Sequence, residues 1–150
     1  MILKELQKDV TVPMAELAET VGSSKSVCWR RIQGYIESGV IRERVAVLEP
    51  HALGLGVTVF AQVKMQRHGK EILPNFVEAI KRHPEVVECH SLTGSVDFLL
   101  KIVVRDVEEY EHFFWNDLSM LENVQEVQTS IALTTFCETT QLPLDRVATK

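Results

Sequence analysis

Cysteine, long apolar runs and a targeting segment are scarce or missing in this sequence of 150 residues. Only Cys28, Cys89 and Cys137 are present, and their odd number and wide spacing suggest no disulfide framework, so we expect a reducing compartment. No apolar run approaches the roughly 18–20 residues that a membrane span needs. The start, MILKELQKDV, is too short and too charged for a signal peptide. We therefore expect a cytoplasmic protein with no membrane partner.

The residue patterns of common catalytic and metal sites are also missing. The sequence has no Gly-rich phosphate loop and no recognisable set of nucleophile, base and orienting residue. Glu108-Glu109 is typical of the acidic first turn of a helix. Cys89 and His90 are adjacent on an expected strand and point to opposite faces, and the remaining histidines complete no zinc spacing. We predict no enzyme activity, no metal site and no cofactor.

What is present is a globular composition with an uneven charge. Apolar residues make up 45% and charged residues 25%, with a net charge of −5. Residues 1–48 have a net charge of +1 and residues 49–150 of −6, while the segment 25–44 alone has +3. This asymmetry indicates a nucleic-acid-facing part joined to a part with another task. A charge of +3 alone does not separate a nucleic-acid surface from a solvated helix.

The first 48 residues predict three short helices. Apolar spacing gives a first helix ending near Asp9 and a second with Pro13 in its first turn and Gly22 at its end. Ser24 is placed to cap the third helix, and Gly39 to end it. Helix, short turn with glycine, helix is the pattern of a helix-turn-helix.

The third helix has one face that suits a core and one that suits DNA. Cys28, Ile32 and Tyr35 recur at spacings of four and three, so we expect them on the buried face. On the other face, Arg30 is suited to guanine and Gln33 to adenine in the major groove. The alternative is a helical hairpin used for packing, with solvated arginines. The residues that we predict to contact DNA are Ser24, Lys25, Ser26, Trp29, Arg30, Arg31, Gln33, Arg42 and Arg44.

Two of these assignments depend on neighbouring structure. Arg42 and Arg44 lie in residues 40–48, whose alternating pattern predicts a two-stranded wing that contacts phosphates. Trp29 borders the buried face of the third helix, which leaves packing open as an alternative to a base contact.

Beyond the turn-rich segment 50–56, the pattern changes to strands and helices in the order βαββαβ, which is the ferredoxin-like arrangement. Gly94-Ser95 is a hairpin signal between the second and third strands. The predicted strands are 57–66, 86–93, 97–104 and 124–133, and the predicted helices are 72–82 and 107–121.

Three stretches together resemble one family. ELAETVGSSKSVCWRRIQGYIESGVI followed by VAVLEPHALGLGV resembles the helix-turn-helix of the leucine-responsive/asparagine-responsive (Lrp/AsnC) regulators. SLTGSVDFLL resembles the hairpin of their effector domain, and the closing V-x-x-V-x-T-S-x-x-L resembles their last strand. The chain starts at a point equivalent to the middle of the family's first helix, so we expect either a truncated start or a short first helix.

The resemblance implies an α+β protein with a winged helix-turn-helix joined to a ferredoxin-like effector and dimerisation domain. We expect a DNA-binding domain at 1–48, a linker at 49–56, an effector domain at 57–142 and a tail at 143–150. The family implies a transcription regulator of double-stranded DNA that responds to an amino acid or a related small molecule. It also implies homodimers that assemble into octamers. Rival classes are an architectural DNA-binding protein without an effector and a small ferredoxin-like enzyme.

By position, the resemblance places the effector beside the hairpin and the last strand. Two alternatives stay open: Asp97 can bond hairpin backbone instead of a ligand ammonium, and Thr129 and Ser130 can be ordinary strand residues. The predicted effector residues are Ser91, Gly94, Ser95, Asp97, Thr129, Ser130, Ile131 and Ala132.

Overall fold

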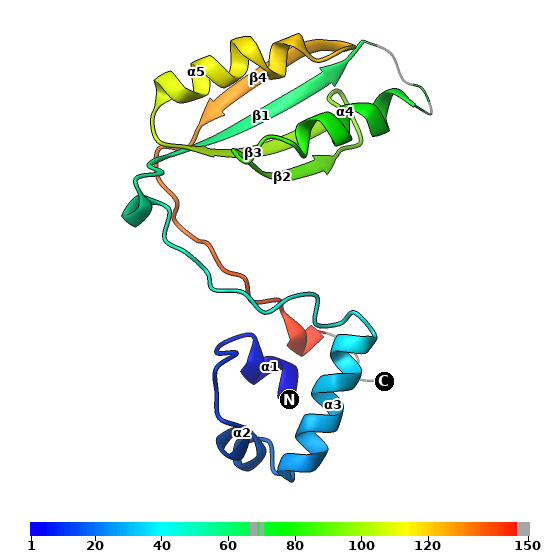
Figure 1. Ribbon diagram of the computed structural model, residues 1–150, viewed down its shortest axis with the longest axis vertical. Helices are drawn as coiled ribbons and strands as arrows, with labels where there is room; N and C mark the ends of the chain where they lie inside the picture. The colour runs from blue at the N-terminus through cyan, green and yellow to red at the C-terminus, as the bar shows by residue number, and fades with distance from the viewer. Residues whose placement is uncertain (67–68, 70, 147–150) are drawn as a thin grey trace. The chain divides into compact units, whose positions relative to one another are not determined.

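The computed structural model describes residues 1–66, 69 and 71–146 of the chain. The chain forms two compact units (Figure 1). Among the described residues, the first unit comprises Met1–Val47 together with residues 136–146, and the second unit comprises Leu48–Thr135.

The first unit is built on three helices, α1 (Ile2–Leu6), α2 (Met14–Thr20) and α3 (Lys25–Glu37). Their core consists of one buried residue of α1, two of α2 and two of α3, namely Ile2, Leu17, Ala18, Cys28 and Ile32. Tyr35 is half-buried against this core. The predicted buried face of the third helix is therefore confirmed, and α1 ends at Leu6, before the end near Asp9 that the sequence predicted.

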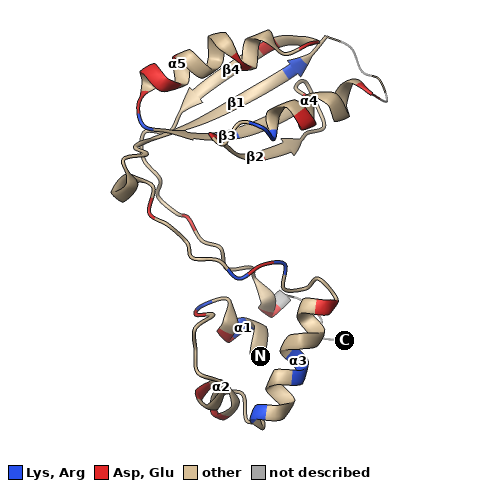
Figure 2. Cartoon of the chain, in the orientation of Figure 1, with Lys and Arg blue, Asp and Glu red and all other residues tan. Residues whose placement is uncertain are grey.

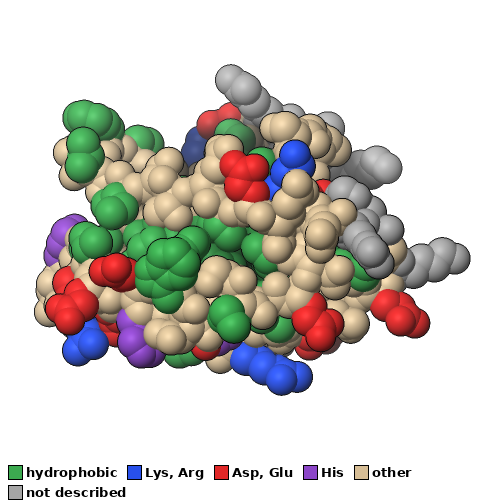
Figure 3. All heavy atoms as spheres, turned by 90° about the horizontal axis from the view of Figure 1, so that it is seen from above, with side chains coloured by type: hydrophobic (Ala, Val, Ile, Leu, Met, Phe, Trp, Pro, Cys, Tyr) green, Lys and Arg blue, Asp and Glu red, His purple; other side chains and the backbone are tan. Residues whose placement is uncertain are grey.

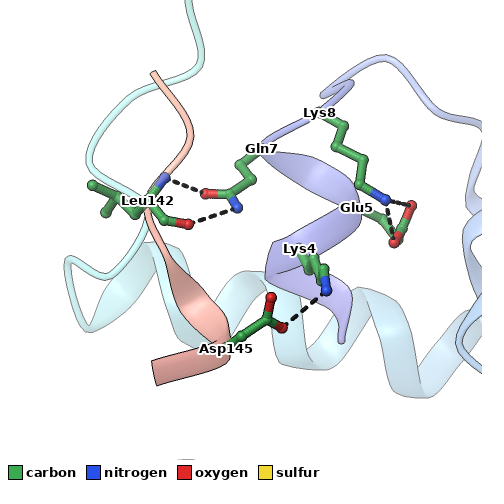
Figure 4. Close-up of polar contacts among 6 residues, drawn as sticks. All are labelled: Lys4, Glu5, Gln7, Lys8, Leu142 and Asp145. Atoms are coloured by element: carbon green, nitrogen blue, oxygen red, sulfur yellow. Dashed lines mark hydrogen bonds and ion pairs between the residues drawn. The ribbon is translucent and has the colours of Figure 1, made fainter. Parts of the chain in front are cut away.

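The C-terminal segment belongs to the first unit because it is bonded to α1 (Figure 4). The Gln7 side chain donates from Nε2 to the Leu142 carbonyl at 3.1 Å and accepts at Oε1 from the Leu142 amide at 3.0 Å. Lys4 Nζ lies 2.9 Å from Asp145 Oδ1, and this hydrogen bond raises the pKa of Lys4. The sequence predicts an effector domain that runs to residue 142. The compact second unit ends at Thr135, because these contacts attach the chain after it to α1.

Residues 40–48 do not form the two strands that were predicted for the wing. Val45, Val47 and Leu48 are 65–75% exposed, and no other described strand lies beside this segment to pair with it. Alternation of apolar residues favours a strand, but a strand forms only where a partner supplies the hydrogen bonds.

The second unit is a four-stranded antiparallel sheet with two helices (Figure 1). Its strand order is β2-β3-β1-β4, so β1 and β3 are central. The elements are β1 (Val57–Met65), α4 (Ile72–Ile80), β2 (Val86–Ser91), β3 (Phe98–Val104), α5 (Val107–Asn116) and β4 (Val124–Ile131). The βαββαβ order predicted from the sequence is confirmed, with several elements ending earlier than predicted.

Both helices cover the same face of the sheet. Val59, Ala61 and Val63 alternate along β1 with zero exposure, and they share one core with Phe76 of α4 and Tyr110 of α5. Strict alternation of this kind is expected of a sheet with one buried face. No described helix is long and apolar enough to cross a bilayer.

Val107 begins α5 but lies outside the core. It is 52% exposed because it is the first residue of the helix, directly after the Asp106 cap, whose carboxylate accepts from the Glu109 amide at 2.8 Å. The apolar residues that follow at helical spacing, Tyr110, Phe113, Phe114 and Leu118, are buried or half-buried.

Candidate nucleic-acid interface and effector site

The turn between α2 and α3 fixes how α3 is presented. Gly22 has φ +65° and closes α2, because its amide bonds the Glu19 carbonyl at 3.1 Å while the Ser23 amide bonds that of Ala18 at 2.8 Å. Ser24 then caps α3, since its hydroxyl accepts from the Val27 amide at 3.3 Å. Both ends of this turn behave as the sequence predicted.

The exposed face of α3 is polar and basic. Lys25, Ser26, Arg30 and Arg31 are exposed and Gln33 is half-buried, while Arg42 and Arg44 beyond the helix are also exposed. Figure 2 shows Lys and Arg along α3, whereas the first turn of α5 is acidic. A surface of this kind can place guanidinium and ammonium groups against phosphates and base edges.

Two of the predicted DNA contacts are already engaged within the chain. The Ser24 and Ser26 hydroxyl oxygens lie 3.1 Å apart, and Ser24 also caps the helix. Ser24 therefore serves as the N-cap of α3, independently of any contact with DNA.

Trp29 is the unexpected feature of this surface. It is 56% exposed and is not part of the apolar core of the first unit. More than half of this side chain is open to solvent, at the border between the buried face of α3, which carries Ile32, and the polar face, which carries Gln33.

The hairpin group of effector candidates lies between β2 and β3. Ser91, Gly94 and Ser95 are exposed, and Gly94 has φ +122°, which few other residues adopt. Asp97 is half-buried, and its Oδ2 accepts from the Met65 amide at 2.7 Å. The Asp97 amide also donates to the Val63 carbonyl at 2.9 Å. The Asp97 carboxylate thus bonds backbone, as the alternative proposed, and that backbone belongs to β1; within the hairpin, the Asp97 carbonyl accepts from the Leu92 amide at 2.8 Å.

The last-strand group is divided between the two faces of the sheet. Thr129 pairs with Ala61 and shares the helix-covered face, where its Oγ1 lies 2.5 Å from Tyr110 Oη. Burial raises the pKa of Tyr110, and the bond to Thr129 opposes that rise. Ser130 pairs with Phe60 on the opposite face. Ile131 is 41% exposed, and the Ala132 amide donates to the Thr58 carbonyl at 2.9 Å.

The two groups of effector candidates lie on opposite sides of β1. The hairpin group meets β1 at Val63, through the Asp97 amide, whereas Thr129 and Ile131 of the last-strand group pair with Ala61 and Val59. Two to four residues of strand separate these points, or about 7–13 Å along β1 at roughly 3.3 Å per residue.

Two hollows occur elsewhere, and sequence reasoning predicted neither. One, of about 530 Å³, lies beside α5 and is lined mainly by charged residues, including Glu85, Arg105 and Glu109. Arg105 donates to Glu109 from its amide at 2.7 Å and from Nε at 3.1 Å. Glu85 Oε2 is buried there without a hydrogen-bond partner among the described residues. No predicted effector residue lines this hollow.

The other hollow, of about 590 Å³, lies in the first unit between α1, residues 40–47 and residues 140–144. Arg42 and Arg44 line it beside apolar residues such as Leu3 and Leu142. Both arginines were predicted from the sequence as DNA contacts. The hollow was not predicted, because the C-terminal segment that forms part of its lining is far away in the sequence.

The described residues contain no group of three or more His, Cys, Asp or Glu side chains suited to a metal ion. His68, one of the histidines considered for a zinc site, lies outside the described residues.

Comparison with known proteins covers both units. The model of the Lrp/AsnC ligand binding domain matches residues 58–142, and a winged helix-turn-helix DNA-binding model matches residues 1–42. The chain is 37% identical over 149 residues to the glutamate uptake regulatory protein of Zymomonas mobilis, covering 99% of this chain and 90% of that protein.

Comparison with solved structures leads to the same family of proteins. An AsnC family transcriptional regulator from Agrobacterium tumefaciens is 42% identical with a TM-score of 0.90, covering 96% of this chain and 94% of that one. A transcriptional regulator from Neisseria meningitidis, solved as a complex with L-Met, is 34% identical with a TM-score of 0.91, covering 96% and 93%. The chain therefore belongs to the Lrp/AsnC family of transcription regulators, as its sequence motifs predicted.

Proposed function

We propose that this chain regulates transcription by binding double-stranded DNA through α3 and by changing its DNA affinity when the second unit binds an amino acid or a related small molecule. The observation that supports this best is the exposed basic face of α3 in a chain with a DNA-binding part and a ligand-binding part of the same regulator family.

The α3 helix enters the major groove with its N-terminal half. Arg30 can form two hydrogen bonds with guanine, and Gln33 with adenine. Lys25 and Arg31 flank them as phosphate contacts, because exposed basic side chains fix the protein on the backbone without reading sequence. Arg42 and Arg44 extend this contact beyond the helix.

The working form is a homodimer, and dimers assemble further to octamers. A two-fold dimer reads two half-sites about one helical turn or a multiple apart, so the target is partly palindromic. The separation of the hairpin and last-strand groups along β1 supports an effector site completed by a second copy.

The effector is an amino acid or a close analogue. The second unit offers the exposed hydroxyls of Ser91 and Ser95 and the open backbone at Gly94 for the charged groups of such a ligand. Relatives support this class, since one is named for glutamate uptake and another is solved with L-Met. No metal or prosthetic group takes part, so a chelator should leave DNA binding unchanged.

The test is quantitative DNA binding by the full chain, at fixed salt, to a duplex that the protein enriches from a random pool. We expect the enriched duplex to bind at least about 10³-fold more tightly than unrelated DNA, and at least one of the twenty amino acids to shift that affinity. A specificity ratio near one without any amino-acid effect would instead assign the chain to the architectural class. Arg30→Ala, with an unchanged unfolding temperature, should lose affinity for the enriched duplex.

A further inference from the structure

Trp29 stands on the part of α3 that is proposed to face DNA. At about 100° per residue, it lies only about 40° around the helix from Gln33 and about 60° from Ser26. Trp29 is 56% exposed, whereas Ile36, two turns further along on the same side of the helix, is 39% exposed. An indole therefore lies among the polar side chains that are placed to meet base edges.

The apolar face of the indole suits one base. Thymine alone presents an apolar group in the major groove, its C5-methyl, while the other edges present only hydrogen-bond donors and acceptors. An indole face pressed against such polar edges would desolvate them without replacing their hydrogen bonds, which is unfavourable. Against a methyl group it removes apolar surface from water.

We infer that Trp29 is a specificity residue that packs on thymine C5-methyl groups in the DNA site. This inference rests on the proposed function, because it needs α3 to lie in the major groove. It goes further by naming a base and the atom group that is read.

Charge argues for DNA rather than a second copy as the partner of Trp29. Lys25, Arg30 and Arg31 around it are all exposed. A two-fold contact through this patch would place each copy's cations against the same cations of the other copy. DNA presents phosphates there instead.

The expected size follows from the burial of one methyl group. About 0.8 kcal/mol per buried CH₂-sized group corresponds to about a four-fold change in the dissociation constant for one methyl. A two-fold dimer contacts a symmetric pair, which gives about fifteen-fold for two methyls.

The experiment uses the full chain and a duplex that it has enriched from a random pool, synthesised once with thymine and once with uracil at every thymine position. Uracil lacks only the C5-methyl. The dissociation constants of both duplexes are measured by fluorescence anisotropy at one salt concentration, for the wild type and for variants. We expect the wild type to prefer the thymine duplex by about four- to fifteen-fold, and Trp29→Ala to lose that preference.

The chain offers a matched control in its only other tryptophan. Trp115 is 62% exposed on α5 of the second unit, so Trp115→Ala removes an indole of similar exposure far along the chain from α3. It should keep the wild-type ratio of thymine to uracil binding. Trp29→Leu should keep part of the ratio, since an apolar side chain remains. Circular dichroism and the unfolding temperature check that each variant is folded, and the wild-type comparison of the two duplexes needs no variant.

Several results would overturn the inference. Equal binding of both duplexes by the wild type would show that no methyl contact exists. An unchanged ratio of uracil to thymine dissociation constants in Trp29→Ala would show that Trp29 does not make that contact. Either result leaves the proposed function standing. A Trp29→Ala protein with a smaller assembly mass and an unchanged ratio assigns Trp29 to a contact between copies. Failure of the wild type to enrich any duplex defeats the proposed function and the inference together.

Discussion

Replacing Asp97 should show that its carboxylate holds the sheet together. Its Oδ2 accepts from the Met65 amide at 2.7 Å, where the register of β1 against β4 shifts between Lys64 and Met65. A bulge disrupts the regular ladder, so the amide needs an acceptor from elsewhere. Met65 is 1% exposed, which leaves water a poor substitute.

The magnitude follows from the charge of the acceptor. A hydrogen bond to a charged group contributes about 1.5–3 kcal/mol, and Asp97→Ala removes it and leaves a buried amide unpaired. In a domain of this size each kcal/mol shifts the unfolding temperature by about 4–8 °C, so we expect a fall of roughly 6–24 °C in the second unit. Asp97→Asn keeps an oxygen acceptor without the charge and should lose about half as much.

The assay combines calorimetric unfolding with hydrogen exchange at the Met65 amide. Faster exchange at that amide in Asp97→Ala, with slower exchange restored in Asp97→Asn, would establish the contact. If Asp97→Ala unfolds within about 0.5 kcal/mol of the wild type and protects the Met65 amide equally well, the structural assignment of Asp97 is refuted.

Three further predictions concern stability. Gly22→Ala should destabilise the first unit by about 1–2 kcal/mol, because φ is +65° there, whereas Gly34→Ala should stabilise it by about 0.5–1 kcal/mol, because a Cβ in mid-helix meets open space. Urea unfolding of both variants checks the opposite signs. Burial raises the pKa of Tyr110 in the folded protein above its value in the unfolded chain. The stability that the protonated hydroxyl contributes is therefore fully present below about pH 10 and is lost as the pH rises through the pKa of the folded state. Tyr110→Phe should cost roughly 0.5–1.5 kcal/mol at pH 7 and show a smaller alkaline loss when unfolding is measured up to pH 12. Gln7→Ala should cost roughly 1 kcal/mol and speed hydrogen exchange at the Leu142 amide, and unchanged exchange would contradict the contact drawn in Figure 4.

The features that sequence predicted well are local and periodic. Cys28 and Ile32 follow helical spacing and are buried, and Ser24 and Gly22 sit where caps belong. The order of elements in the second unit was predicted equally well, because alternating strands and helices with an apolar stripe are recognised from the periodicity of their own residues.

The features that sequence missed depend on distant partners. The Asp97 carboxylate bonds a residue 32 positions away, and Gln7 bonds one 135 positions away, through backbone atoms that leave no pattern in the side chains. The pairing predicted for residues 40–48 failed for the same reason, because a strand requires a neighbour that its own residues do not specify. Trp29 lies near the edge between buried and exposed faces, where helical spacing alone does not decide burial.

The most direct test of the central claim is the affinity of the full chain for its enriched duplex, measured with and without each of the twenty amino acids. The account predicts at least about a thousand-fold preference over unrelated DNA, an affinity shifted by at least one amino acid, and loss of the preference in Arg30→Ala. Equal affinity for all duplexes, unmoved by every amino acid and by Arg30→Ala, would contradict it.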